Sequence, residues 1–106
     1  MSAPTENAIN LEGEASDELG KESWEVARVW ITNGAGSHVW IAAWALDDAK
    51  SFGHLMADTI RHGAKAYATT YALDEAETLQ KIVDGVGEEL REQFETITMI
   101  SPGGLN

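Results

Sequence analysis

The stretch VARVWITNGAGSHVWIAAW, residues 26–44, most constrains the fold, because it predicts a β-hairpin that is apolar on both faces. Two runs alternate with the period of two that is typical of strands. Between them, Gly34 and Gly36 can supply the positive φ angles that a hairpin turn requires. We therefore predict antiparallel strands at about 23–32 and 37–45.

The two faces of this hairpin differ in kind. The loop favours a register with Val29 opposite Ile41 and Trp30 opposite Trp40, and this register gathers the aliphatic residues on one face. The other face is named here the indole face, because it carries all four tryptophans of the chain together with one cation. It comprises Trp24, Arg28, Trp30, Trp40 and Trp44.

A two-stranded hairpin is only marginally stable alone, and two amphipathic helices can cover only one of its faces. We expect the helices on the aliphatic face, because β-branched and small residues suit helix-on-sheet packing. The indole face then needs another cover. A second copy of the chain is favoured, because Trp and Arg are enriched at the centres of interfaces. Burial by the chain's own termini and binding of an aromatic ligand stay open as alternatives.

Beyond residue 47 the apolar period changes from two to three and four, which indicates helices. Two stripes predict helices at about 48–70 and 75–94, with Asp47 or Asp48 as the first N-cap and Asp74 opening a capping-box variant. Gly85 and Gly87 lie within the second helix and could allow close packing against the first. The fold class is therefore α+β, with an antiparallel hairpin followed by two antiparallel helices.

We predict a single α+β domain at residues 23–96, with a separate segment at each end of the chain. Residues 1–22 form an acidic, partly mobile arm, in which residues 8–11 could make a short edge strand. Residues 97–106 are a tail, in which the β-prone residues 97–100 could make another strand.

The charge disfavours nucleic acids and anionic membranes as partners. The chain has 106 residues, with 18 acidic and 7 basic side chains and a formal net charge of −11, so phosphate backbones and anionic membrane surfaces repel it. It has no cysteine, which excludes disulfides and thiolate chemistry. The first ten residues lack the features of a secretory signal, and no apolar run is long enough to span a membrane. We expect a cytoplasmic protein that binds neither nucleic acid nor membrane.

One polar stripe on the first predicted helix could bear chemistry. His54, Asp58 and His62 lie at successive intervals of four, but the two histidines are separated by about 12 Å of helix, so one ion cannot bridge them. A metal would need help from His38. A solvated stripe in which Asp58 pairs with Arg61, His62 or Lys65 is the favoured interpretation, and a histidine–carboxylate enzyme site is the alternative.

Several segments resemble a family of small bacterial proteins of about 100 residues, catalogued as a domain of unknown function. These segments are EVARVWI, HVWI, DDAKSFGHLMADTIRHGAKAYA and LDEAETLQKIVDGVGEEL, which together span roughly residues 25–94. The resemblance implies a compact bacterial α+β domain and carries over no catalytic residue.

The sequence thus favours a non-enzymatic accessory or binding protein that self-associates, most simply as a homodimer, and that uses no cofactor. The alternative is a small-molecule or metal-binding enzyme that uses the polar stripe of the first helix. No sequence feature identifies a small-molecule ligand.

Overall fold

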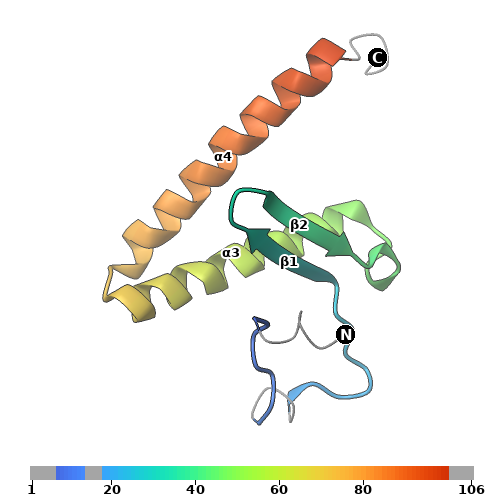
Figure 1. Cartoon of the computed structure of the whole chain (residues 1–106), viewed down its shortest axis with the longest axis vertical. Coiled ribbons are helices and arrows are strands. Elements are labelled where there is room, and N and C mark those ends of the chain that lie inside the picture. Colours follow the sequence, from blue (N-terminus) through green and yellow to red (C-terminus); the bar gives the residue numbers. More distant parts are fainter. Residues whose placement is uncertain (1–6, 14–17, 101–106) are drawn as a thin grey trace. The chain divides into compact units, whose positions relative to one another are not determined.

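The computed structural model describes residues 7–13 and 18–100, with side chains up to Glu95 (Figure 1). The predicted α+β order is confirmed, since an antiparallel hairpin is followed by two helices. The elements are β1 (Ala27–Thr32), β2 (Gly36–Ile41), the 3-10 helix η1 (Ala43–Ala45), α3 (Ala49–Tyr71) and α4 (Glu75–Ile100). They belong to two compact units, Met1–Asp47 and Asp48–Asn106, and each unit is described by itself.

The register of the hairpin differs from the predicted one by two residues. Trp40 lies opposite Arg28 rather than Trp30, and Val29 lies opposite Val39 rather than Ile41. Because side chains alternate with a period of two, a shift of two residues leaves every side chain on its predicted face. The division into an aliphatic face and an indole face therefore holds along the paired strands.

The turn explains this register. The loop consists of residues 33–35, so that Thr32 pairs with Gly36, and the Ala35 N–H donates to the Thr32 carbonyl at 2.9 Å. Gly34 and Gly36 both have φ of +81°, which side chains with a Cβ rarely adopt. Both glycines are therefore used for their positive φ, with the second one inside β2 rather than in the loop.

Both strands are shorter than predicted at their open ends. The Ala42 N–H donates to the Val26 carbonyl at 2.8 Å, just beyond the last paired residues. The chain then tightens into η1, where Ala45 N–H donates to the Ala42 carbonyl at 3.0 Å. Trp44 consequently lies in a 3-10 turn, and Trp24 precedes β1.

The N-terminal residues 8–11 form no strand, which corrects that part of the prediction. The Glu12 N–H is bound by the Asn10 side chain at 3.0 Å, and Gly13 has φ of +82°, so this segment follows turn geometry. It borders a groove along β1 that Ile9 and Leu11 help to line. Residues 1–6 and 14–17 of the predicted acidic arm lie outside the described residues.

Both helices begin at aspartates that the sequence identified. The Asp48 carboxylate accepts from the Ser51 N–H at 3.2 Å and from the Ser51 hydroxyl at 3.0 Å. The Asp74 carboxylate accepts from the Glu77 N–H at 2.9 Å, which is the predicted N-cap arm of the capping box. These caps satisfy N–H groups that no helical carbonyl can reach.

Helix α3 ends at Tyr71, and the C-cap residue Ala72 has φ of 54° in the left-handed region. The Leu73 N–H donates back to the Ala68 carbonyl at 3.0 Å, as in the turns that usually place glycine at this position. We expect Ala72→Gly to raise the free energy of unfolding by about 0.5–1 kcal/mol, because glycine relieves the contact between Cβ and the carbonyl oxygen. Chemical denaturation followed by circular dichroism measures this change, and a lower midpoint would contradict it.

Helix α4 runs to Ile100, so residues 97–100 form neither the possible short strand nor an irregular tail. Ile97 and Ile100 continue the three- and four-residue spacing of Val83, Val86 and Leu90, so the helical period extends through the β-prone segment. Intrinsic β-propensity is a weak prior that this periodicity overrides.

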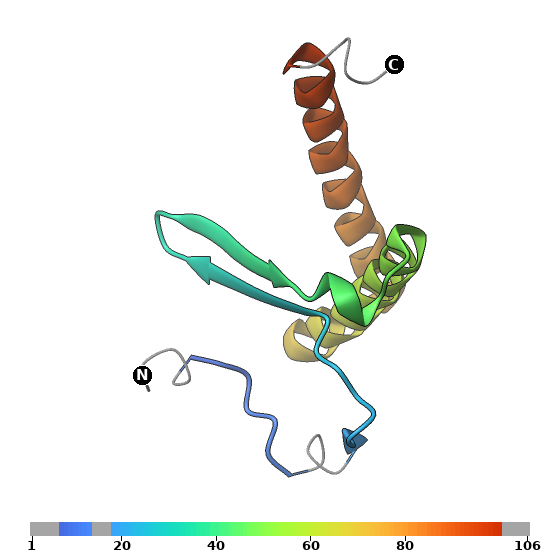
Figure 2. The ribbon, with the colours of Figure 1, turned by 90° about the vertical axis from the view of Figure 1, so that its right-hand side faces the viewer.

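The two helices meet near the turn that joins them and diverge beyond it (Figures 1 and 2). Ala64 is fully buried, Thr78 is 8% exposed, and a Cβ at Gly63 would meet the Ile82 side chain at 3.8 Å. Gly63 is therefore the glycine of close approach. Gly85 and Gly87 meet nothing within 4 Å, which corrects their predicted role in helix packing.

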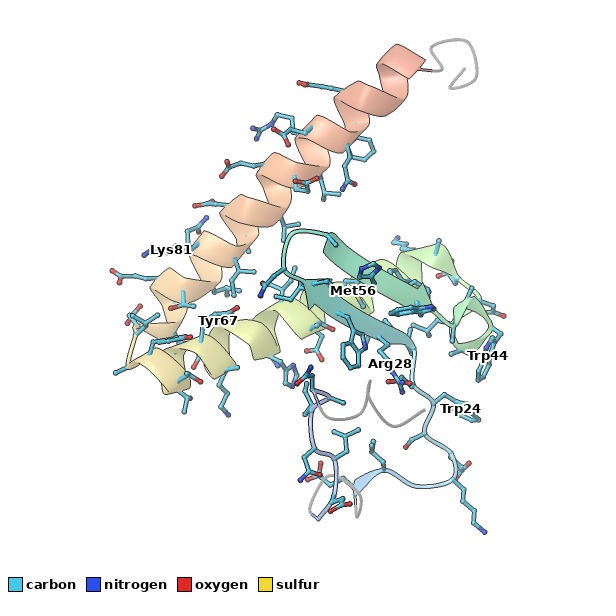
Figure 3. The ribbon with its side chains drawn as sticks, viewed as in Figure 1. Trp24, Arg28, Trp44, Met56, Tyr67 and Lys81 are labelled. Carbon is cyan, nitrogen blue, oxygen red and sulfur yellow. The ribbon has the colours of Figure 1, made fainter. Side chains whose placement is uncertain are left out.

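Few large apolar side chains are covered in either unit. Among the described residues, Ala64 is the only buried hydrophobic residue, and none of the large side chains is fully buried. On α3, Tyr67 (Figure 3) stacks with Tyr71 at a ring-centroid distance of 6.1 Å, yet both side chains remain exposed. In the described part of the chain, no helix is both long and apolar enough to cross a membrane.

Candidate interaction surface

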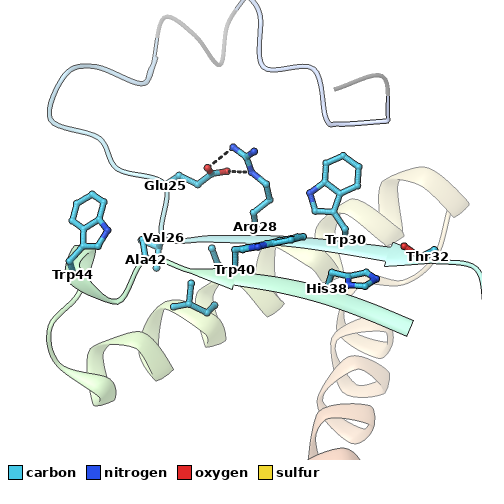
Figure 4. A pocket seen from close by; sticks show the side chains of 11 residues that line it. Glu25, Val26, Arg28, Trp30, Thr32, His38, Trp40, Ala42 and Trp44 are labelled. Carbon is cyan, nitrogen blue, oxygen red and sulfur yellow. Dashed lines mark hydrogen bonds and ion pairs between the residues drawn. The ribbon is translucent and has the colours of Figure 1, made fainter. Parts of the chain in front are cut away.

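The indole face of the hairpin forms a shallow open groove (Figure 4). Two cross-strand pairs build its floor, Arg28 opposite Trp40 and Trp30 opposite His38. The hairpin twist and these large side chains leave a hollow of about 750 Å³. Its lining consists of Glu25, Val26, Ala27, Arg28, Trp30, Thr32, His38, Trp40, Ile41, Ala42 and Trp44.

The aromatic side chains of the groove are ordered but open to solvent. The His38 and Trp40 rings stack with centroids 6.3 Å apart and planes inclined by 25°. Trp40 nevertheless remains 60% exposed and Trp44 71% exposed. Such large apolar area in water is unfavourable, at roughly 25 cal/mol for each Å². Covering the groove with another molecule would therefore lower the free energy.

The charge within the groove is locally balanced. The Arg28 Nη2 donates to Glu25 Oε1 at 2.6 Å, and its Nε donates to Oε2 at 3.1 Å (Figure 4). The hydrogen bond to Glu25, and then its negative charge, raise the pKa of Arg28 above the ordinary value, while burial opposes this slightly. A base with a raised pKa stays protonated as pH rises, so this ion pair persists throughout the neutral range.

The structure brings four of the five predicted interface residues together. Arg28, Trp30, Trp40 and Trp44 line the groove, whereas Trp24 lies before β1 and is outside the lining (Figure 3). Sequence reasoning missed Glu25 as the partner of Arg28. Their separation of three residues was the available signal, but strand alternation placed Glu25 on the opposite face. Because Glu25 precedes β1, that alternation does not apply to it.

The polar stripe of α3 forms local contacts around Asp58, as the favoured interpretation predicted, and the contact with His62 is an ion pair only when that imidazole is protonated. Arg61 Nη2 lies 3.8 Å from Asp58 Oδ1, and His62 Nδ1 lies 3.6 Å from Asp58 Oδ2. All three side chains are more than half exposed. His54 lies on the same helix, whereas His38 belongs to the hairpin unit. No group of three or more metal-ligating side chains occurs among the described residues.

A family model described as "Domain of unknown function (DUF5076)" matches residues 15–94. This match extends over most of the chain and includes β1, β2, α3 and α4 as far as Phe94. The chain belongs to this family.

The residues of the groove all lie within the family region. A comparison with curated proteins found no match. Among solved structures, the chain is similar to one described as "a putative pyruvate dehydrogenase from the photosynthetic bacterium Rhodopseudomonas palustrus CGA009". The two share 28% sequence identity with a TM-score of 0.57, over 80% of this chain and 87% of the other. The likeness therefore covers most of both chains.

Proposed function

We propose that this chain is a self-associating, non-enzymatic binding or accessory protein of the bacterial cytoplasm, and that two copies meet through the indole face. The observation that carries this proposal is the open groove, in which Trp30, Trp40 and Trp44 surround one neutralised cation. The bacterial source of the similar structure and the cysteine-free sequence support the proposed location in the bacterial cytoplasm.

Electrostatics favour a second copy on this face over most other surfaces of the chain. With a net charge of −11, two copies repel each other unless they meet where charge is low. The groove contains one acid and one base, and these are paired with each other. Closing the groove therefore buries indole area without leaving an unpaired charge, which would otherwise oppose association.

The proposed dimer has two-fold symmetry, because both copies use the same indole face. When the same face is used by both copies, each residue contacts its counterpart's neighbours and the assembly closes as a dimer. Trp and Arg anchors at the centre, with polar residues such as Thr32 at the rim, are typical of such contacts.

A small planar ligand is the other occupant that the groove could hold. Its volume of about 750 Å³ lies within the ~300–1,000 Å³ of many ligand pockets, but ligand pockets are usually enclosed. The activity in the description of the Rhodopseudomonas structure refers to that protein. The described residues of this chain supply no observation that favours it here.

Tryptophan fluorescence tests this proposal directly, because all four tryptophans lie in the hairpin unit. We expect blue-shifted emission and protection from acrylamide when the protein is associated, because the partner copy then covers the indoles. On dilution, the emission should move to the red as the light-scattering mass falls. Emission and quenching that stay constant while the mass halves would place the interface on another surface.

A further inference from the structure

The outer half of α4 is an amphipathic helix that packs against no other described element of its own unit. Contacts with α3 lie near the connecting turn, where Ile82 approaches Gly63, and the helices diverge beyond it (Figure 2). From that point the apolar residues of α4 become exposed, to 45% at Leu90 and 66% at Phe94. An isolated helical segment of this length is marginally stable in water, so packing of its apolar stripe against a partner would stabilise it.

The spacing of this stripe identifies a suitable partner. Beginning at Leu79, apolar residues recur at alternating intervals of four and three, with Gln93 as the single polar member. The series is Leu79, Val83, Val86, Leu90, Gln93, Ile97 and Ile100. Sustained alternation of this kind is typical of a coiled-coil seam, whose knobs and holes suit a second copy of the same helix. The part from Val83 onward is named here the α4 seam.

The charges of α4 allow two copies to meet on this seam. The helix carries seven acids and two bases, but at 100° per residue Asp84, Glu88 and Glu95 project from the side opposite the seam. Beside the seam, Glu89 lies on one flank and the uncharged Phe94 lies on the other. In a parallel pair each Glu89 flank faces the partner's uncharged flank, whereas an antiparallel pair would bring Glu89 towards Glu89.

We propose that the α4 seam is a second self-association surface, on which α4 of one copy packs in parallel against α4 of another. The seam spans about 25 Å from Val83 to the end of the helix, which is short for an independent coiled coil. Its contribution therefore adds to that of the indole face. The inference rests on the proposed function only in requiring two copies, since it places a contact on a different unit of the chain.

Single-cysteine variants of the full chain test this arrangement, because the natural sequence has no cysteine that could compete. We expect Val83→Cys and Leu90→Cys each to form disulfide-linked dimers under mild oxidation at low concentration, since a parallel pair places identical seam residues together. Gly85→Cys is the matched control, because it lies off the seam and its Cβ meets no atom within 4 Å. We expect at least tenfold less crosslinking there. Circular dichroism checks that the helix content of each variant is unchanged.

The outcomes separate this inference from the proposed function. Crosslinking at Leu90 without Val83 would overturn the parallel arrangement. A dimer that Trp40→Glu dissociates, and that crosslinks at neither seam position, would overturn the seam and leave the indole interface in place. Crosslinking at both seam positions in a dimer that survives Trp40→Glu would support the seam and overturn the indole interface. A monomer at every concentration would overturn both.

Discussion

Trp40→Glu is expected to weaken self-association about 100- to 1,000-fold, which corresponds to roughly 3–4 kcal/mol. Trp40 lies in the middle of the groove, stacked on His38 and opposite Arg28. In a two-fold interface both copies would bury the new carboxylate, and the two charges would lie close together. Arg28 cannot readily neutralise them, because Glu25 already holds it at 2.6 Å. Sedimentation equilibrium measures the change in Kd.

The matched control for this variant is Ser37→Glu. It introduces the same charge on the same strand, but Ser37 is exposed and projects from the aliphatic face near the turn. We expect its Kd to stay within about threefold of wild type, as surface substitutions usually change free energies by less than ~0.5 kcal/mol. Equal weakening by both variants would mean that general charge repulsion, and not the indole face, governs association.

Ala64→Glu is expected to destabilise the helical pair by about 3 kcal/mol, which is the largest stability effect that we predict. Ala64 is fully buried at the place where α3 meets α4, close to the contact between Gly63 and Ile82. A longer side chain must push the helices apart, and its carboxylate would find no partner there. Urea denaturation followed at 222 nm by circular dichroism measures the loss.

Ala66→Glu provides the comparison, since Ala66 lies two residues away on the exposed side of α3. We expect a change of less than about 0.5 kcal/mol for it. If both variants were equally stable, the helices would not be packed at Ala64 as described.

The faces of the hairpin followed from the sequence, but the register did not. Alternation of Val29, Trp30 and Ile31 determines which side each residue takes, and a slip of two positions leaves that division intact. The register therefore depends on the turn, and the sequence NGAG is compatible with more than one position of the loop. Only the geometry shows that Gly36 uses its positive φ within β2.

The helices were predicted well where caps and periodicity agree, as at Asp48 and Asp74. The end of α4 was missed because Ile97 and Ile100 favour strands by propensity, while their spacing belongs to the helix. The roles of the glycines were misjudged for another reason. A glycine allows two helices to approach closely only where they cross, and the position of the crossing point cannot be predicted directly from the sequence.

Most of the candidate surface was predictable, because Arg28, Trp30 and Trp40 alternate on one face of paired strands. Trp24 was misplaced since β1 begins only at Ala27, after which alternation applies. The ion pair of Arg28 with Glu25 could not follow from strand geometry, because Glu25 lies in the irregular segment before the strand.

The most direct test of the central claim is the solution mass of the full chain, measured by light scattering on wild type and on Trp40→Glu. The proposed self-association predicts a wild-type mass of at least twice the 11.5 kDa of one chain, and a lower mass for the variant at the same concentration. A wild-type mass of 11.5 kDa at all concentrations, together with cooperative unfolding, would contradict it.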